Sequence, residues 1–96
     1  MTPRIIFNHT DGTRQTVSAI PMGVCSQQID VIVEDGIIAK VAFSGGCSGN
    51  TQGLSALLQG MKVIDAIQRL QGIDCNYKGT SCPDQLAQVL KVMVDK

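Results

Sequence analysis

Two Asp-Gly dipeptides place the strongest constraint on how this chain folds, because each stands between two β-prone segments. Asp-Gly flanked by alternating apolar residues is a strong signal for a two-residue β-hairpin turn. The first dipeptide, Asp11-Gly12, separates residues Arg4 to Asn8 from residues Thr13 to Ile20. We therefore expect a β-hairpin in the first twenty residues.

The second dipeptide, Asp35-Gly36, lies between two longer alternating segments. Before it, Ile29, Val31 and Val33 alternate with polar residues, although Ile32 interrupts the polar face. After it, one set of residues alternates with another: Ile37, Ala39, Val41 and Phe43 with Ile38, Lys40 and Ala42. Two hairpins in succession predict an antiparallel sheet with one buried face.

The hydrophobic period changes from 2 to 3.6 after the glycine-rich segment that spans Ser44 to Asn50. Three apolar stripes at helical spacing follow, the first two ending at Gly60 and Gly72. The third begins at Pro83, a favoured first-turn residue, with Asp84 placed to interact with the helix dipole. The stripes consist of Leu54, Leu57 and Leu58; of Val63, Ala66, Ile67 and Leu70; and of Leu86, Val89, Leu90, Met93 and Val94. Ile73 to Ser81 is predicted to form an irregular polar loop.

Strands followed by helices predict an α+β domain, an antiparallel sheet of hairpins with three helices packed on one face. The 96 residues leave room for a single domain, residues 1–96. With 44% apolar and 17% charged residues, the chain is expected to be ordered.

Charge and aromatic content exclude several kinds of partner. Eight basic residues balance eight acidic ones, so no net field attracts nucleic acid, a membrane or an acidic substrate, and with 3% aromatics no base-stacking platform for nucleic acid is expected. The first residues contain no signal-peptide core, and no later segment reaches the length of a membrane span. We expect a cytoplasmic protein without a membrane partner, whose neutral charge is compatible with a homo-oligomer.

The four cysteines, Cys25, Cys47, Cys75 and Cys82, carry most of the functional information. Each is predicted at the end of a strand, helix or loop, where segments converge and a polar site can form. Cys47 and Cys82 precede predicted helices, whose N-termini favour the thiolate, and a thiolate is both a metal ligand and a nucleophile. In a cytosolic protein, metal or redox chemistry explains four cysteines more readily than structural disulfides do.

Three interpretations of the cysteines remain open at this point. All four can bind one metal ion or cluster, although their spacing is not that of a zinc knuckle. Cys75 and Cys82 can instead cycle between dithiol and disulfide. The third interpretation is a plain interaction module in which the thiols are buried as small hydrophobes.

Other polar residues have simpler explanations. His9, beside a predicted turn, is expected to be solvated, and Lys78 is expected to be an exposed loop residue. The segment Gly45 to Thr51 precedes a helix and can cradle an anion, but it lacks the Gly-Lys-Ser/Thr of a P-loop. No triad of nucleophile, base and orienting group can be assembled without cysteine, so no catalytic residue is assigned.

The segment Thr80-Ser81-Cys82-Pro83-Asp84 is the signature of the TSCPD domain family. Gly45 to Leu54, with Gly60-Met61 and Gly72-Ile73-Asp74-Cys75, resembles the rest of that family, from about Ile20 to the C-terminus. Such domains occur alone and at the C-terminal end of B12-dependent ribonucleotide reductases.

This resemblance implies a function connected with nucleotide reduction and DNA synthesis. A 96-residue domain cannot enclose the barrel, radical cysteine and cobalamin of a reductase, so it is too short to catalyse that reaction alone. We therefore expect an accessory, acting on a ribonucleotide reductase or another redox protein as a metal-binding domain or a thiol–disulfide electron shuttle.

The chain from Cys25 onward is more distantly similar to the IscU-type iron–sulfur cluster scaffolds. On that pattern Cys25, Cys47 and Cys82 match the three scaffold cysteines. Gln27 and Ser81 replace an Asp and a His of the scaffolds, and Cys75 is a further thiol that can supply the fourth ligand. The two resemblances together favour one site that binds zinc or, as the alternative, an iron–sulfur cluster through Cys25, Cys47, Cys75 and Cys82.

Overall fold

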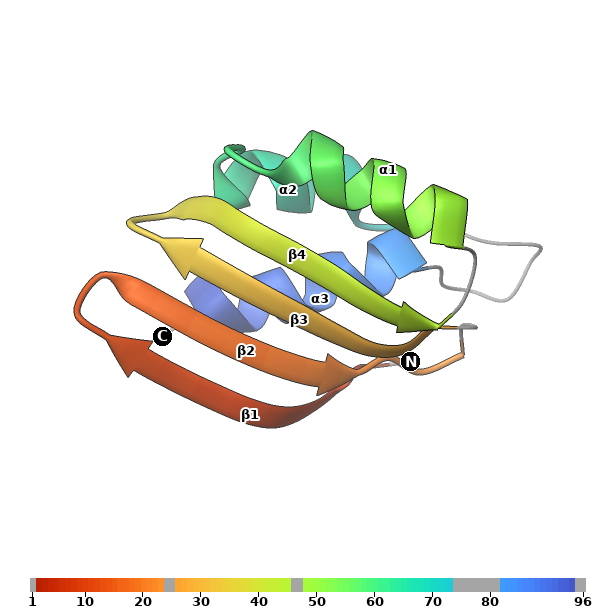
Figure 1. Cartoon of the computed structure of the whole chain (residues 1–96), viewed down its shortest axis with the longest axis horizontal. Helices are drawn as coiled ribbons and strands as arrows, with labels where there is room; N and C mark the ends of the chain where they lie inside the picture. The colour runs from red at the N-terminus through yellow and green to blue at the C-terminus, as the bar shows by residue number, and fades with distance from the viewer. Residues whose placement is uncertain (1, 24–25, 46–47, 74–81, 95–96) are drawn as a thin grey trace.

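The computed structural model describes residues 2–23, 26–45, 48–73 and 82–94 of the chain (Figure 1). Four strands come first and form one sheet in the order β1-β2-β3-β4, each antiparallel to its neighbours. Their bounds are β1 Arg4–Asp11, β2 Arg14–Ile20, β3 Ser26–Glu34 and β4 Ile37–Gly45. The predicted antiparallel sheet of hairpins is confirmed.

The two hairpin turns differ in how closely they match the prediction. Asp35 and Gly36 form the turn between β3 and β4, both with positive φ (52° and 76°), as a tight hairpin turn of this kind requires. In the first hairpin, Asp11 still pairs with Arg14, so the turn residues are Gly12 and Thr13. The predicted Asp11-Gly12 turn is thus wrong by one residue, and Gly12 (φ 63°) supplies the positive φ.

A β-bulge in β4 changes which of its residues face the core. Val33 pairs with Ile38, whereas Ile32 pairs with Lys40, which leaves Ala39 as the extra residue on β4. Ile38 and Val41 therefore share the buried face, with exposed fractions of 0% and 5%. The predicted strict alternation, with Ile38 on the same face as Lys40, is wrong because a bulge shifts the side-chain period by one residue.

The three helices follow the sheet and cover one of its faces (Figure 1). Their bounds are α1 Ser48–Leu58, α2 Val63–Leu70 and α3 Cys82–Val94. The core lies between this helical layer and the inner sides of β2, β3 and β4, and it includes the whole predicted stripe of α2. Leu57 and Val94 are exceptions to the predicted stripes, exposed at 76% and 44%. Leu57 lies outside the arc that α1 presents to the core, whereas Val94 is exposed because it is the last residue of α3.

The two edges of the sheet differ in whether another segment covers them. Beside the beginning of β4, Ile37 forms a bridge with Lys62, and the Ile38 N–H donates to the carbonyl oxygen of Met61 at 2.9 Å. The segment between α1 and α2 therefore covers part of this edge. No strand or helix of the described residues lies beside the outer edge of β1 (Figure 1).

Within the described residues, no helix combines the length and hydropathy that crossing a lipid bilayer requires.

Candidate functional site

The structure describes the surroundings of the predicted cysteine site more fully than the cysteines themselves. Cys82 is the first residue of α3, one residue before the predicted start of that helix. Cys25, Cys47 and Cys75 lie outside the described residues, as does Lys78. The described segments that flank each cysteine can nevertheless be compared in space.

The first turn of α3 holds two other segments of the chain through buried side chains. The Gly72 N–H donates to Oδ1 of Asp84 at 2.7 Å, and the Met22 N–H donates to Oε1 of Gln85 at 2.8 Å. Asp84 is 9% exposed and Gln85 is fully buried, so both bonds lie in a region largely sheltered from water. Asp84 Oδ2 also accepts a bond from Nε2 of Gln88 at 3.1 Å, which fixes the orientation of the carboxylate.

These two hydrogen bonds connect the chain close to three of the cysteines. Met22 comes three residues before Cys25, Gly72 comes three residues before Cys75, and Cys82 begins the helix that carries both acceptors. The sequence predicted only a helix-dipole role for Asp84 and no role for Gln85. The partners of these side chains lie 12 and 63 residues away, beyond the reach of local patterns.

The remaining described segments of the site are the paired ends of β3 and β4. Ser26, the residue after Cys25, pairs with Gly45, which comes two residues before Cys47. Gly45 has a φ of 77°, and a Cβ atom there would lie 3.1 Å from Cγ of Gln27. The backbone at Gly45 therefore has a left-handed conformation beside the Gln27 side chain, where a larger residue would be strained.

All of these segment ends lie at one end of the molecule. The end of β4, the beginning of α1 and the beginning of α3 lie together along the long axis in Figure 1, opposite the two hairpin turns. In the described part of the chain, no group of three or more His, Cys, Asp and Glu side chains is arranged to hold a metal ion.

His9 lies on β1, where it is exposed beside Phe7, with ring centroids 6.3 Å apart. The predicted solvated histidine is confirmed, but it belongs to the strand and not to the turn. Because β1 is the far edge strand of the sheet, His9 is not among the described segments that flank the cysteines.

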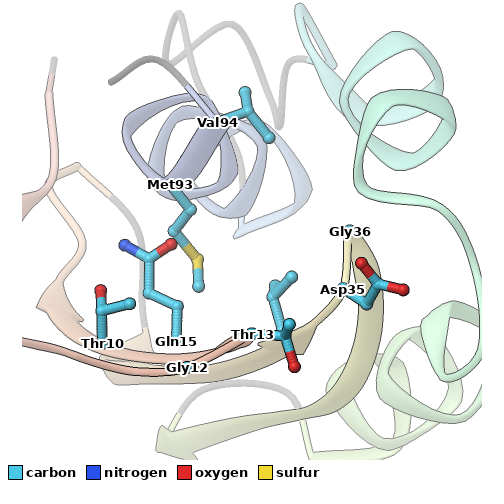
Figure 2. Close-up of a pocket in the computed structure, with 9 residues that line it drawn as sticks. Thr10, Gly12, Thr13, Gln15, Asp35, Gly36, Met93 and Val94 are labelled. Carbon is cyan, nitrogen blue, oxygen red and sulfur yellow. The ribbon is translucent and has the colours of Figure 1, made fainter.

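A pocket of about 330 Å³ lies between the first hairpin and the C-terminal end of α3. Met93 extends from the helix toward Gln15 on β2, with Thr10 and Asp35 at the sides (Figure 2). The described residues that line it include no cysteine. They include both hairpin turns, at the end of the sheet opposite the described segments that flank the cysteines (Figure 1).

The fold and the surroundings of the cysteines define a small α+β domain in which one helix N-terminus ties together loops from both halves of the chain. A family model, the TSCPD domain, matches residues 2–94. The chain belongs to the TSCPD domain family, and the match extends the predicted resemblance to nearly the whole chain.

Searches of the curated proteins and of the solved structures found no significant match. The α+β class is confirmed by the structure, whereas the more specific comparison with IscU-type scaffolds is not.

Proposed function

We propose that Cys25, Cys47, Cys75 and Cys82 together bind one zinc ion, or in the alternative one iron–sulfur cluster, at the end of the sheet where α3 begins. The observation that carries the proposal is the pair of hydrogen bonds from the Met22 and Gly72 N–H groups to Gln85 and Asp84. They connect the segments that lead to Cys25 and Cys75 with the helix that begins at Cys82.

The lengths of the connecting segments support convergence. An extended chain spans at most about 3.6 Å per residue, so three residues cover no more than about 11 Å. Each cysteine lies within three residues of a described residue in the segments that flank the proposed site. These residues are Met22, Ser26, Gly45, Gly72 and Asp84. No long linker therefore has to fold back for the four sulfurs to meet.

The donor set fits a closed structural centre. Four thiolates satisfy the tetrahedral preference of zinc and leave no position for water or substrate. Two of the four cysteines occur at or just before the start of a helix, since α1 begins at Ser48 and α3 at Cys82. Backbone N–H groups at helix N-termini favour the deprotonated thiol, which is the form that binds metal.

Metal binding would stabilise this fold because the ligands come from four separate segments. A site that forms only in the folded chain contributes its binding free energy to folding. Such a centre would hold the two hairpins and the third helix in one arrangement. That role suits a small domain whose core has few aromatic residues.

The partner class that family membership suggests is a ribonucleotide reductase or another redox protein of the cytoplasm. The chain is too short to perform nucleotide reduction itself, so we propose an accessory role, in which the metal centre maintains a docking domain. The second candidate is electron transfer by a Cys75–Cys82 dithiol. The hydrogen bond between Gly72 and Asp84 favours it, since it brings the flanks of these two cysteines together.

The two candidates differ in the response to single Cys→Ser variants. For each variant, metal per chain is measured after anaerobic purification, together with the visible absorption spectrum. The zinc proposal expects about one zinc per wild-type chain and a large loss in all four variants, including Cys25→Ser. A brown chromophore with iron and sulfide would identify the cluster alternative.

The matched control is Leu58→Ala, which removes a buried core side chain (3% exposed) at a position that supplies no ligand. It should lower stability but keep the metal stoichiometry. If all four variants lack metal and Leu58→Ala lacks it too, the loss reflects unfolding and the binding is measured again at lower temperature. A metal-free wild type, with a Cys75–Cys82 couple that survives Cys25→Ser, would contradict the zinc proposal and support electron transfer.

A further inference from the structure

The outer edge of β1 is an open strand edge with little of the usual protection. Edge strands of natural proteins are commonly protected by charged side chains, above all lysine, by proline, by bulges or by a covering segment, and β1 has one bulge and two charged residues at its ends. Arg4–Asp11 contains neither lysine nor proline, and among the described residues no strand or helix lies beside its outer edge (Figure 1). Ile6 and Phe7 in this strand are exposed at 48% and 51%.

A bulge determines which side chains of β1 share a face. Ile5 pairs with Ala19, and the next pair is Phe7 with Ser18, so Ile6 is an extra residue. Ala19 and Val17 are fully buried under the helices, so their partners Ile5 and Asn8 point to the helix side.

Thr10, opposite the buried Gln15, also points to the helix side, whereas the remaining paired residues of β1 point to the helix-free face. They are Arg4, Phe7, His9 and Asp11. Without the bulge, Arg4 and Asp11 would fall on opposite faces, because seven positions is an odd number along a strand.

We propose that β1 pairs antiparallel with β1 of a second copy of this chain, around a two-fold axis at Asn8. Counted along the ladder with Ile6 as the bulge, this register places Arg4 opposite the partner's Asp11 and Phe7 opposite the partner's His9. The same two contacts recur on the other side of the axis. Every position of the ladder then has a partner, and an Arg4–Asp11 pair of opposite charge lies at each of its two ends.

The pairing is complementary in charge and in shape. Opposite charges and aromatic groups directly across two strands stabilise antiparallel pairing. Phe7 and His9 already lie 6.3 Å apart within one chain, at an interplanar angle of 32°. Two copies would bring four rings together on the helix-free face. The two four-stranded sheets would join into one continuous sheet with all helices on one side.

The register is tested by charge reversal at its two ends. Sedimentation equilibrium of the reduced wild-type protein between about 10 µM and 1 mM is expected to show a monomer–dimer equilibrium. Arg4→Asp and Asp11→Arg each turn two attractive pairs into repulsive ones, and each should raise the dissociation constant about tenfold. The double variant Arg4→Asp/Asp11→Arg should return to the wild-type value, because the pairs are restored with their charges exchanged.

Mixing the two single variants makes the test sharper. In a mixed dimer both end pairs are opposite in charge, so an equimolar mixture should dimerise more strongly than either variant alone. Asp65→Arg reverses a charge on the exposed face of α2 and should leave the dissociation constant unchanged. Circular dichroism of each variant checks that the fold is retained.

A disulfide trap tests the position of the axis. Asn8→Cys places two thiols directly across the two-fold axis, within the Cα separation that a disulfide accepts. Thr10→Cys places its thiols four ladder positions apart, about 14 Å, which is too far. Oxidation should therefore cross-link Asn8→Cys but not Thr10→Cys, with the wild type as the control for the native cysteines.

Three results would overturn the proposal. They are a monomer at all concentrations, a dimer that neither charge reversal weakens, and equal cross-linking at positions 8 and 10. The inference does not depend on the metal centre, and the metal content of the same samples is measured separately.

Discussion

At the scale of single residues, Asp84 is the side chain on which the arrangement of the cysteine segments most depends. It accepts hydrogen bonds from the Gly72 N–H and from Gln88, and it is almost completely buried. We expect Asp84→Ala to lower the free energy of unfolding by about 2–3 kcal/mol, since it removes a charged acceptor from buried donors. Urea unfolding measures the change.

The matched control for this prediction is Asp65→Ala. Asp65 also lies in the first turn of a helix, but it is exposed. Asp65→Ala should lower the free energy of unfolding by less than about 1 kcal/mol, the size of a helix-dipole interaction at the surface. If Asp84→Ala and Asp65→Ala lowered the free energy of unfolding equally, Asp84 would stabilise the protein through the helix dipole, as the sequence alone suggested, and not through its hydrogen bond with Gly72.

Gln85 supports a second prediction at the residue scale. Gln85→Leu keeps the volume but removes the acceptor of the Met22 N–H, and an unsatisfied buried N–H costs about 1–3 kcal/mol. Gln68→Leu, at an exposed position of α2, should change stability by less than about 0.5 kcal/mol. If the two variants unfold at the same urea concentration, the Met22–Gln85 bond does not stabilise the fold.

At the scale of strands and helices, the chain offers a matched pair of glycines. A Cβ atom added at Gly36 or at Gly53 would meet nothing within 4 Å, so neither substitution creates a collision. Gly36 has a φ of 76° in a hairpin turn, whereas Gly53 lies inside α1. Gly36→Ala should therefore destabilise the protein by about 1–2 kcal/mol, and Gly53→Ala should stabilise it by about 0.5–1 kcal/mol. If Gly36→Ala and Gly53→Ala changed the free energy of unfolding in the same direction, this assignment of backbone conformations would be contradicted.

The leucines of α1 provide a second prediction at this scale. Leu58 is 3% exposed and Leu57 is 76% exposed, although both belong to the predicted apolar stripe. Leu58→Ala should cost about 2–5 kcal/mol by leaving a cavity, whereas Leu57→Ala should cost less than about 0.5 kcal/mol. Thermal or urea unfolding of the two variants measures these losses of stability. A larger loss for Leu57→Ala than for Leu58→Ala would contradict the orientation of α1 in the structure.

The elements show which structural features can be predicted from the sequence and which cannot. Asp35-Gly36 and the stripe of α2 were predictable because turn chemistry and helical periodicity are local. The bulges at Ile6 and Ala39 were not, because an extra residue in one strand appears only once that strand is paired with its neighbour. For the same reason Ile38 was assigned to the wrong face.

At the scale of the whole molecule, the fold separates the regions to which the two proposals refer. The described segments that flank the cysteines lie where β4 ends and α1 and α3 begin, and the proposed self-pairing edge is β1 (Figure 1). The sequence predicted the four candidate ligands from their positions at element ends. The hydrogen bonds that hold their flanking segments together, from Met22 to Gln85 and from Gly72 to Asp84, could come only from the tertiary structure.

The central claim is that four cysteines share one metal ion, and X-ray absorption at the zinc edge of the protein as purified tests it most directly. The account predicts about one zinc per chain, surrounded by four sulfur atoms at about 2.3 Å and by no nitrogen or oxygen ligand. Fewer than four sulfur ligands, or a wild-type protein that carries neither zinc nor iron and has four free thiols, would contradict the claim.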